Sequence, residues 1–351
     1  MLGHNNTTNY SSPVQVPGNN WDYVVGTRGT RSKLGSKTDG TLWAWGDNDK
    51  GLLGQSESGP AQRSSPTQIP GSTWSTVIGS TSTTSFAATK TDGTLWAWGY
   101  NNVGQLGQNS RTDYSSPVQI GSDTTWPKTN QDHLSNANNG AHAIKTDGTL
   151  WCWGENDKGV LGQNSITYYS SPVQVPGTTW AGVKGKRMSK FGVKTDGTLW
   201  VWGGNSAGQL GLNDRTDYSS PVQVPGTTWS TATSSSNYGS SFGIKTDGTL
   251  WSWGQNYYGM LGQNAGEPAR RSSPTQIPGT TWRSIAADWK AAVIATKTDG
   301  TIWGWGHNNV GQLGHNNTTN YSSPVQVPGT WNSSISMSYS SAMAFQTDTT
   351  P

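Results

Sequence analysis

Apolar and polar residues alternate in a phrase that recurs along the whole chain. Successive copies begin 53, 55, 49, 51, 52 and 49 residues apart, the last being a shortened copy at Gln346. Repeats of this length are typical of solenoids and propellers. The phrase is Lys-Thr-Asp-Gly-Thr-Leu/Ile-Trp-x-Trp-Gly, and its complete copies open at Lys37, Lys90, Lys145, Lys194, Lys245 and Lys297.

Each copy of the phrase predicts a hairpin followed by a strand. Asp-Gly between two short runs favours a tight type I′ turn, which needs positive φ at its central residues. The following Leu-Trp-x-Trp alternates with period two, so both tryptophans should lie on one face of the strand and x on the other. We expect the tryptophan face of one unit to pack on the small-residue face of its neighbour. The x residues are all small: Ala44, Ala97, Cys152, Val201, Ser252 and Gly304.

A second repeated segment supplies another strand of each unit. Residues 2–18 and 313–329 are identical, and related versions begin at Leu53, Leu106, Leu161, Leu210 and Leu261. Each contains Ser-Ser-Pro before a short alternating run, and proline suits an edge strand that can spare a ladder donor. Two weaker strands separate this segment from the tryptophan phrase. Four antiparallel strands per unit predict the blade of a β-propeller.

We therefore predict an all-β chain that forms one β-propeller domain over residues 1–351. The repeats run at about 2–52, 53–105, 106–160, 161–209, 210–260 and 261–312, with a partial copy at 313–351. Six blades should be complete between about Trp21 and Gly329. We favour a seventh that joins strands near 331–348 to an N-terminal strand near 11–16, which would protect sheet edges. The alternative is a six-bladed ring with both end pieces left over.

Composition narrows the possible partners and surroundings. Glutamate is nearly absent, and a net charge of +3 is too small to favour nucleic acid as a partner. Cys152 is the only cysteine, so we expect no disulfide framework. We also expect no membrane span, since no apolar stretch is long enough. Met1 leads into polar residues, from which we predict no secretory signal peptide.

Little in the sequence points to catalysis, and we predict no catalytic residue, no cofactor and no metal site. The five histidines form no His-x₃-His or His-x-Glu pair. Residues 47–51 and 155–159 resemble a calcium loop, but their glycine and distal glutamate are out of register, which favours a turn. His133 beside Asp132 is the best available acid–base pair. It is a weak candidate, and we expect a protein that is not an enzyme.

Differences between the copies concentrate in two sets of loops that should lie at one end of every blade. The first set includes residues 28–33, 131–140, 184–190, 234–240 and 288–290, and the second includes 57–63, 109–114, 164–169, 213–218 and 265–271. Loops on a rigid scaffold often carry recognition, although such loops also drift under weak constraint. The candidate partner-binding residues are Tyr114, Tyr168, Tyr169, Tyr218, Trp289, Arg215, Arg270 and Arg271. At the opposite end, the repeated lysines Lys37 to Lys297 form an alternative site, or are simply solvated turn residues.

The stretches 92–107, 196–211 and 299–314 carry a recognisable likeness. Strand, Asp-Gly, x-Leu-Trp-x-Trp-Gly-x-Asn-x-x-Gly-Gln-Leu-Gly and a following Pro-Val-x-Val resemble the repeats of the regulator of chromosome condensation family. The resemblance covers essentially the whole chain and implies a propeller, usually of seven blades. Founding members exchange guanine nucleotide on a small GTPase and bind nucleosomes through loops and tails outside the repeat. The chain has no matching basic tail or inserted wedge, so no functional residue carries over.

The sequence favours a non-enzymatic structural or recognition module that binds a protein or glycan surface. We expect such a module on a virion or cell surface, with a cytoplasmic location as another option. The alternative is guanine nucleotide exchange or another regulatory role on a GTPase, as the resemblance implies. An incomplete seventh blade would leave an exposed edge, which could accept a strand from another protein or from a second copy.

Overall fold

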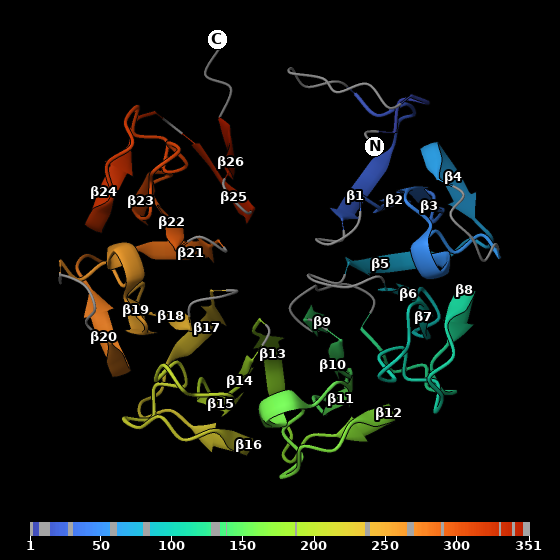
Figure 1. Cartoon of the computed structure of the whole chain (residues 1–351), viewed down its shortest axis with the longest axis horizontal. Coiled ribbons are helices and arrows are strands. Elements are labelled where there is room, and N and C mark those ends of the chain that lie inside the picture. Colours follow the sequence, from blue (N-terminus) through green and yellow to red (C-terminus); the bar gives the residue numbers. More distant parts are fainter. Residues whose placement is uncertain are drawn as a thin grey trace. The chain divides into compact units, whose positions relative to one another are not determined.

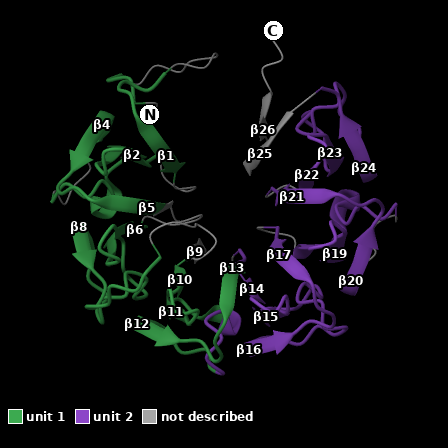
Figure 2. Ribbon diagram, turned by 180° about the vertical axis from the view of Figure 1, so that it is seen from behind, with its two compact units in different colours: residues 1–157, 165–183 green, residues 158–164, 184–351 purple. Residues whose placement is uncertain are grey.

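The computed structural model describes most of the chain. The described residues are 3–6, 15–26, 31–56, 62–79, 85–127, 134–137, 139–186, 188–235, 239–264, 270–288, 291–329, 331–338 and 341–346. Two compact units are present (Figure 2): unit 1 comprises residues 1–157 and 165–183, and unit 2 comprises residues 158–164 and 184–351.

Strands account for nearly all of the regular structure, and they form six four-stranded antiparallel sheets (Figure 1). The first three sheets contain β1 (Trp21–Gly26), β2 (Lys33–Lys37), β3 (Leu42–Gly46) and β4 (Arg63–Ile69); β5 (Trp74–Gly79), β6 (Ser85–Lys90), β7 (Leu95–Gly99) and β8 (Tyr114–Gln119); and β9 (Leu134–Ala137), β10 (Gly140–Ile144), β11 (Leu150–Gly154) and β12 (Tyr169–Gln174). In each sheet the strands pair in chain order, which is the predicted blade.

The other three sheets repeat this arrangement. They contain β13 (Trp180–Lys184), β14 (Ser189–Lys194), β15 (Leu199–Gly203) and β16 (Tyr218–Gln223); β17 (Trp229–Ser234), β18 (Ser240–Lys245), β19 (Leu250–Gly254) and β20 (Arg271–Ile277); and β21 (Trp282–Ala287), β22 (Ala292–Lys297), β23 (Ile302–Gly306) and β24 (Tyr321–Val327). We call the six sheets blades 1 to 6 in chain order.

A seventh blade is not confirmed. Among the described residues, strands β25 (Trp331–Ser338) and β26 (Ser341–Gln346) pair only with each other, as a two-stranded sheet. Most of the N-terminal strand expected near residues 11–16 lies outside the described residues, and Gln15 and Val16 are not in a strand. Six complete four-stranded sheets fit the six-bladed alternative.

Residues 3–6 nevertheless contact blade 1 as the loops of other blades contact their neighbours. The amide of Asn5 donates to the carbonyl of Ser64 at 2.9 Å, just as Ser56 donates to Ser115 at 2.8 Å between blades 1 and 2. Gly3 lies against the indole of Trp45, as Gly54 lies against that of Trp98. Residues 3–6 therefore cover part of blade 1 in unit 1.

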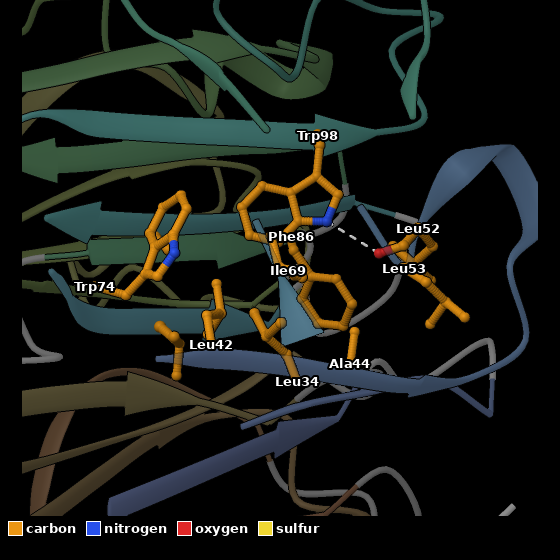
Figure 3. Close-up of a cluster of buried hydrophobic side chains, with 11 residues drawn as sticks. Leu34, Leu42, Ala44, Leu52, Leu53, Ile69, Trp74, Phe86 and Trp98 are labelled. Atoms are coloured by element: carbon orange, nitrogen blue, oxygen red, sulfur yellow. Dashed lines mark hydrogen bonds between the residues drawn. The ribbon is translucent and has the colours of Figure 1, made fainter. Parts of the chain in front are cut away.

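Tryptophan packing between neighbouring blades forms the cores (Figure 3). Trp98 of blade 2 is fully buried in one hydrophobic cluster with Leu34, Leu42 and Ala44 of blade 1, and its indole nitrogen donates to the carbonyl of Leu52 at 3.0 Å. This contact confirms the predicted packing of a tryptophan face on a small-residue face. The two tryptophans of each pair differ, however. The second is fully buried, whereas the first, such as Trp96, is half-buried.

The Asp-Gly turn is not the type I′ turn that the sequence predicts. Four residues connect β2 to β3, the amide of Gly40 donates to the carbonyl of Lys37, and only Gly40 of the central residues has positive φ (+78°). Longer hairpin loops are commonly built on a type I turn. Here Asp39 stabilises the loop, because its Oδ1 accepts from the amide of Thr41 at 2.9 Å and from its hydroxyl at 2.6 Å.

Candidate functional site

Antiparallel pairing places the four connections of a blade at two ends. The connections between strands one and two and between strands three and four share one end, which we call the loop end. The Asp-Gly turns and the Pro-Gly segments that lead to the next blade share the other, the turn end. The amide of Trp74 donates to the carbonyl of Gly40 at 2.9 Å, which joins the two kinds of connection at the turn end.

A buried asparagine holds each long connection at the loop end. Asn101 is fully buried; its Oδ1 accepts from the amide of Leu106 at 2.9 Å, and its Nδ2 donates to the carbonyls of Ser110 and Thr112. The same acceptor contact recurs at 2.9 Å in four other blades, from Asn48, Asn205, Asn256 and Asn308. Buried amide groups that are fully hydrogen-bonded fix the shape of these loops.

In alternate blades, a short 3₁₀ turn lies between the third and fourth strands and contacts the following blade. They are η1 (Asp49–Gly51), η3 (Asp157–Gly159) and η4 (Tyr257–Gly259). Their central residues have left-handed φ of 54–60° and reach the following blade. Lys50 pairs with Asp113 at 3.8 Å, Lys158 pairs with Asp217 at 3.2 Å, and Tyr258 packs on His307 with ring centroids 4.3 Å apart.

The two segments that resembled calcium loops are these 3₁₀ turns. In the first of them, Asn48 accepts the amide of Leu53 and Lys50 pairs with a carboxylate of the next blade. Over the described part of the chain, no three His, Cys, Asp or Glu side chains lie close enough together to hold a metal ion. Within these segments, residues 49–51 and 157–159 form 3₁₀ turns.

The predicted tyrosines begin the outer strands. Tyr114, Tyr169 and Tyr218 stand at one repeat position, each opposite the last glycine of its Trp-x-Trp-Gly strand. All three are half-buried. Tyr114 and Tyr218 pack against hydrophobic clusters of their units, which gives their rings a structural role in addition to any role in binding.

Hydrogen bonds hold two tyrosine hydroxyls in place. The hydroxyl of Tyr168 donates to Asp157, and this bond to a carboxylate raises the pKa of Tyr168 to about 12. The hydroxyl of Tyr218 donates to Asp214 at 2.7 Å, which also raises the pKa of Tyr218. Both phenols therefore stay protonated near neutral pH and are poor candidates for general bases.

The predicted arginines are solvent-exposed. Arg215 is exposed in the loop before β16, and Arg270 and Arg271 are exposed at the start of β20. The guanidinium Nε of Arg271 donates to Gln263 at 3.0 Å. The described residues among those predicted therefore occur one or two to a blade, in blades 2 to 5. Trp289, Asp132 and His133 lie outside the described residues.

The repeated lysines at the turn end are not simply solvated. Each is half-buried or buried, and its Nζ lies over tryptophan rings. Lys90 is 4.7 Å from the ring of Trp74 and 4.1 Å from that of Trp96. Similar contacts of 4.0–5.1 Å to two rings occur at Lys37, Lys145, Lys245 and Lys297, and a contact of 4.4 Å to one ring occurs at Lys194. Through these cation–π contacts, the lysines that were considered as an alternative binding site stabilise the fold.

Sequence reasoning missed both the lysine–tryptophan contacts and the role of the buried asparagines. The asparagine signal was available, because Gly-x-Asn occurs in all six copies of the loop. The lysine contacts depend on strand register, in which Lys90 lies opposite Trp74. That pairing joins residues that are far apart within one repeat, so the tryptophan phrase alone does not reveal it.

Repeated four-stranded blades with tryptophans wedged between neighbours define the chain as a blade-repeat protein of the propeller class. A family model for the regulator of chromosome condensation (RCC1) repeat matches residues 39–87, 92–128, 147–184, 196–240, 247–289 and 299–342. The chain belongs to this RCC1 repeat family.

Known proteins share the repeats and the fold. The human E3 ubiquitin-protein ligase HERC2 is 26% identical over 305 residues, which is 84% of this chain but 5% of HERC2. A zebrafish Protein RCC2 homolog is 40% identical over 78 residues, 22% of this chain and 15% of that protein. The chain thus spans a small part of the curated relatives that it matches.

Two solved structures share the fold at low identity. Human WBSCR16 superposes with a TM-score of 0.73 at 18% identity, covering 93% of this chain and 87% of that one. Prp20p of Saccharomyces cerevisiae superposes with a TM-score of 0.69 at 18% identity, covering 92% and 82%. None of the helices among the described residues is long and apolar enough to cross a membrane.

Proposed function

We propose that the chain is a regulatory scaffold that binds a protein partner through the loop end of its blades. The observation that carries this proposal is the contrast between the two ends. The turn end repeats Lys-Thr-Asp-Gly-Thr in six copies, whereas the central residue of the 3₁₀ turn or its equivalent varies as Lys50, Val103, Lys158, Ala207, Tyr258 and Val310. Side chains that vary between copies and are held on a rigid scaffold are typical of surfaces that recognise a partner.

Two features of the loop end support binding of a protein. The buried asparagines fix the loops in advance, which lowers the entropy cost of association. The same end exposes tyrosine, arginine and aliphatic side chains, including Tyr258 (40% exposed), Val310 (57%) and Ile166 (70%). Tyrosine and arginine are enriched at the centres of protein interfaces.

Family membership favours a regulatory role over a surface display role. Prp20p has been described with its binding to Gsp1p and histones, and yeast RCC1 (Prp20) has been crystallised with Kap60 bound. These partners are proteins, and we extend only that class to this chain. The comparisons give no support to a virion or cell surface location, nor to glycan binding or strand donation at an incomplete blade.

Site-specific photo-crosslinking in the producing cells tests the proposal. A photoreactive phenylalanine analogue replaces Arg111 or Arg215, which are exposed at the loop end of units 1 and 2. Matched variants carry it at Thr178 or Thr227, which are exposed at the turn end. We expect a discrete protein adduct from a loop-end position and none from the turn-end positions. Adducts from the turn end alone would contradict the proposal.

Regulation of a GTPase is a second candidate, which the likeness to the fold of Prp20p favours. Release of a fluorescent guanine nucleotide from Gsp1p, followed in the presence of the chain, tests it. Acceleration that depends on loop-end residues would support exchange activity. Unchanged release from Gsp1p and from the small GTPases of the producing cell would leave the scaffold role without this activity.

A further inference from the structure

Basic residues concentrate in one stretch of the chain. Residues 158–195 contain six lysines and arginines and no aspartate or glutamate. The remaining 17 basic side chains are outnumbered by 20 acidic ones, so this stretch accounts for the positive net charge of the whole chain. Segregated charge of this kind creates a local potential that attracts a partner of opposite sign.

Most of this charge lies in or directly beside the loop, residues 185–188, that connects β13 to β14. Lys194 belongs to the turn end, where it contacts Trp200, and Lys158 pairs with Asp217. Lys184, Lys186 and Lys190 lie in or beside the loop, with Lys184 and Lys186 half-buried. Arg187 belongs to the same loop in the sequence and lies outside the described residues.

Contacts within unit 2 hold the described residues in and beside this loop in place. Lys190 is 1% exposed, and its Nζ donates to the carbonyl of Lys186 at 3.0 Å. The amide of Lys186 donates to the hydroxyl of Ser234 in blade 5 at 3.2 Å, and the amide of Gly204 donates to the carbonyl of Met188 at 2.6 Å. A loop tied to two blades presents its lysines at fixed positions.

An apolar side chain and a notch accompany the lysines. Met188 is 45% exposed at the tip of the loop. Gly204 stands where the other blades carry Asp47, Tyr100, Glu155, Gln255 or His307. A Cβ at Gly204 would lie at ordinary van der Waals distance from two side chains, 3.5 Å from the Cβ of Met188 and 3.6 Å from that of Lys158. The notch is the place of the side chain that Gly204 lacks beside these two residues.

We propose that Lys184, Lys186, Met188, Lys158 and Gly204 form a docking site for an acidic protein segment that carries an apolar side chain. The carboxylates of the segment would meet the lysines, and its apolar side chain would lie against Met188 in the notch. Methionine adapts readily to varied apolar partners. This inference rests on the proposed function, and it names the chemistry of the partner.

An acidic peptide fits these observations better than a nucleic acid does. The described cations occupy one short loop and one neighbouring turn, whereas nucleic-acid binding surfaces carry long basic stripes with stacking rings. An exposed methionine beside a notch also favours a partner with apolar side chains. Single-stranded DNA is therefore a competing probe in the test.

Fluorescence anisotropy with the full chain tests the site. The probe is a labelled peptide of repeated Asp-Glu-Leu, and comparison probes are repeated Asp-Glu-Ser, repeated Lys-Lys-Leu and oligothymidylate. We expect the Asp-Glu-Leu peptide to bind most tightly and its affinity to fall as salt is raised. The variant K184E/K186E should weaken binding about tenfold or more, since it reverses the local charge.

Matched variants distinguish binding at this site from a general electrostatic attraction of the acidic peptide to the chain. R283E/T227E/T280E lowers the net charge by the same four units on exposed residues of unit 2 outside the loop end, and should leave peptide binding unchanged. G204Q installs the residue type that blade 5 has at this position, without left-handed strain, and should weaken the Leu-containing peptide more than the Ser-containing one. K184Q/K186Q, which should weaken binding in the same direction, replaces the reversal if that variant does not fold.

Each outcome decides the question. Equal losses in K184E/K186E and R283E/T227E/T280E, no binding of the acidic peptide, or tighter lysine-dependent binding of oligothymidylate would overturn the inference. Failure here with loop-end crosslinks intact would leave the proposed function standing. Absence of loop-end crosslinks alongside site-dependent peptide binding would instead count against the proposed scaffold role while supporting the basic site.

Discussion

The lysine that opens each repeated phrase is a packing residue as well as a charge. Lys245 lies 4.9 Å from the ring of Trp229 and 4.7 Å from that of Trp251, and the two rings themselves meet edge to face. The ammonium group is attracted to the faces of the indoles, and its alkyl stem covers part of them. Six such contacts along the chain explain why the turn end is constant.

Removing one of these charges should lower stability measurably. Lys245→Met keeps the length of the side chain but loses the cation–π contact, so the free energy of unfolding should fall by about 0.5–1 kcal/mol. Lys245→Arg keeps a cation over the rings and should remain close to the wild type. Chemical denaturation of both variants measures the difference, and equal stability of Lys245→Met and wild type would contradict the assigned role.

The aspartates of the Asp-Gly turns make the stability of the fold depend on pH in the acidic range. Hydrogen bonds from the hydroxyl and amide of Thr249 lower the pKa of Asp247, and the same arrangement lowers the pKa of Asp39, Asp92, Asp147, Asp196 and Asp299. A lowered pKa in the folded state contributes stability above the unfolded value of 3.8. That contribution is lost as pH falls through the folded pKa.

We therefore expect the melting temperature of the wild type to fall on acidification below about pH 4. Asp247→Asn keeps an acceptor in the turn but does not titrate, so its melting temperature should fall less over the same range. Thermal unfolding between neutral pH and strong acid measures both curves. Parallel curves for the two proteins would show that this carboxylate does not contribute.

At the scale of elements, the two tryptophans of each strand have different tasks. The second wedges between blades and donates its indole N–H to a loop carbonyl of the preceding blade, as Trp253 does to Gln209 at 2.8 Å. The first is half-buried and donates to the threonine of its own turn, as Trp251 does to Thr249 at 2.9 Å. One strand therefore serves both the joint between blades and its own hairpin.

Truncation of the two tryptophans of blade 2 should show this difference. Trp98→Ala removes a fully buried ring from the cluster that includes Ala44 and Leu52, and should cost about 3–5 kcal/mol. Trp96→Ala, the matched control, removes a half-buried ring and should cost clearly less. Denaturant titration compares them, and equal losses would mean that position in the strand does not decide the contribution.

The N-terminal segment should stabilise blade 1. Its contacts to Ser64 and Trp45 repeat those that join neighbouring blades. Deleting residues 1–18 should therefore lower the melting temperature, because Trp45 loses its cover. Gly3→Val is a milder test, since Gly3 has a φ of +87° and a Cβ would lie 3.2 Å from the indole of Trp45. An unchanged melting temperature in the deletion variant would contradict this role.

Local sequence patterns predicted the blades but not all of the turns within them or the contacts between them. Period-two alternation placed Trp98 and Ala44 on interacting faces, because strand periodicity is a property of adjacent residues. The type I′ turn was wrong, since the connection has four residues and Asp39 hydrogen-bonds within it. The Lys90–Trp74 contact and the Lys158–Asp217 pair depend on register and on neighbouring blades, so a single repeat does not contain them.

At the scale of the whole molecule, constant and variable parts of the repeat lie at different ends of the blades within each unit. In each unit, the turns at one end of the blades have a constant sequence and hydrogen-bond internally. The loops at the other end vary in sequence and are held by buried asparagines. Membership of the RCC1 repeat family sets the fold, while function depends on what the loops present. Residues 158–195 contain six basic residues and no acidic one, the largest such number between two acidic residues; the next, residues 23–38 of blade 1, contain four.

Hydrogen–deuterium exchange of the chain with its crosslinked partner protein bound, compared with the free chain, tests this account most directly. The account predicts new protection in the loop-end segments 109–114, 164–169, 184–190 or 213–218, and unchanged exchange in the turns 38–41, 91–94 and 195–198. Protection confined to the turns, with the loops exchanging as in the free chain, would contradict it.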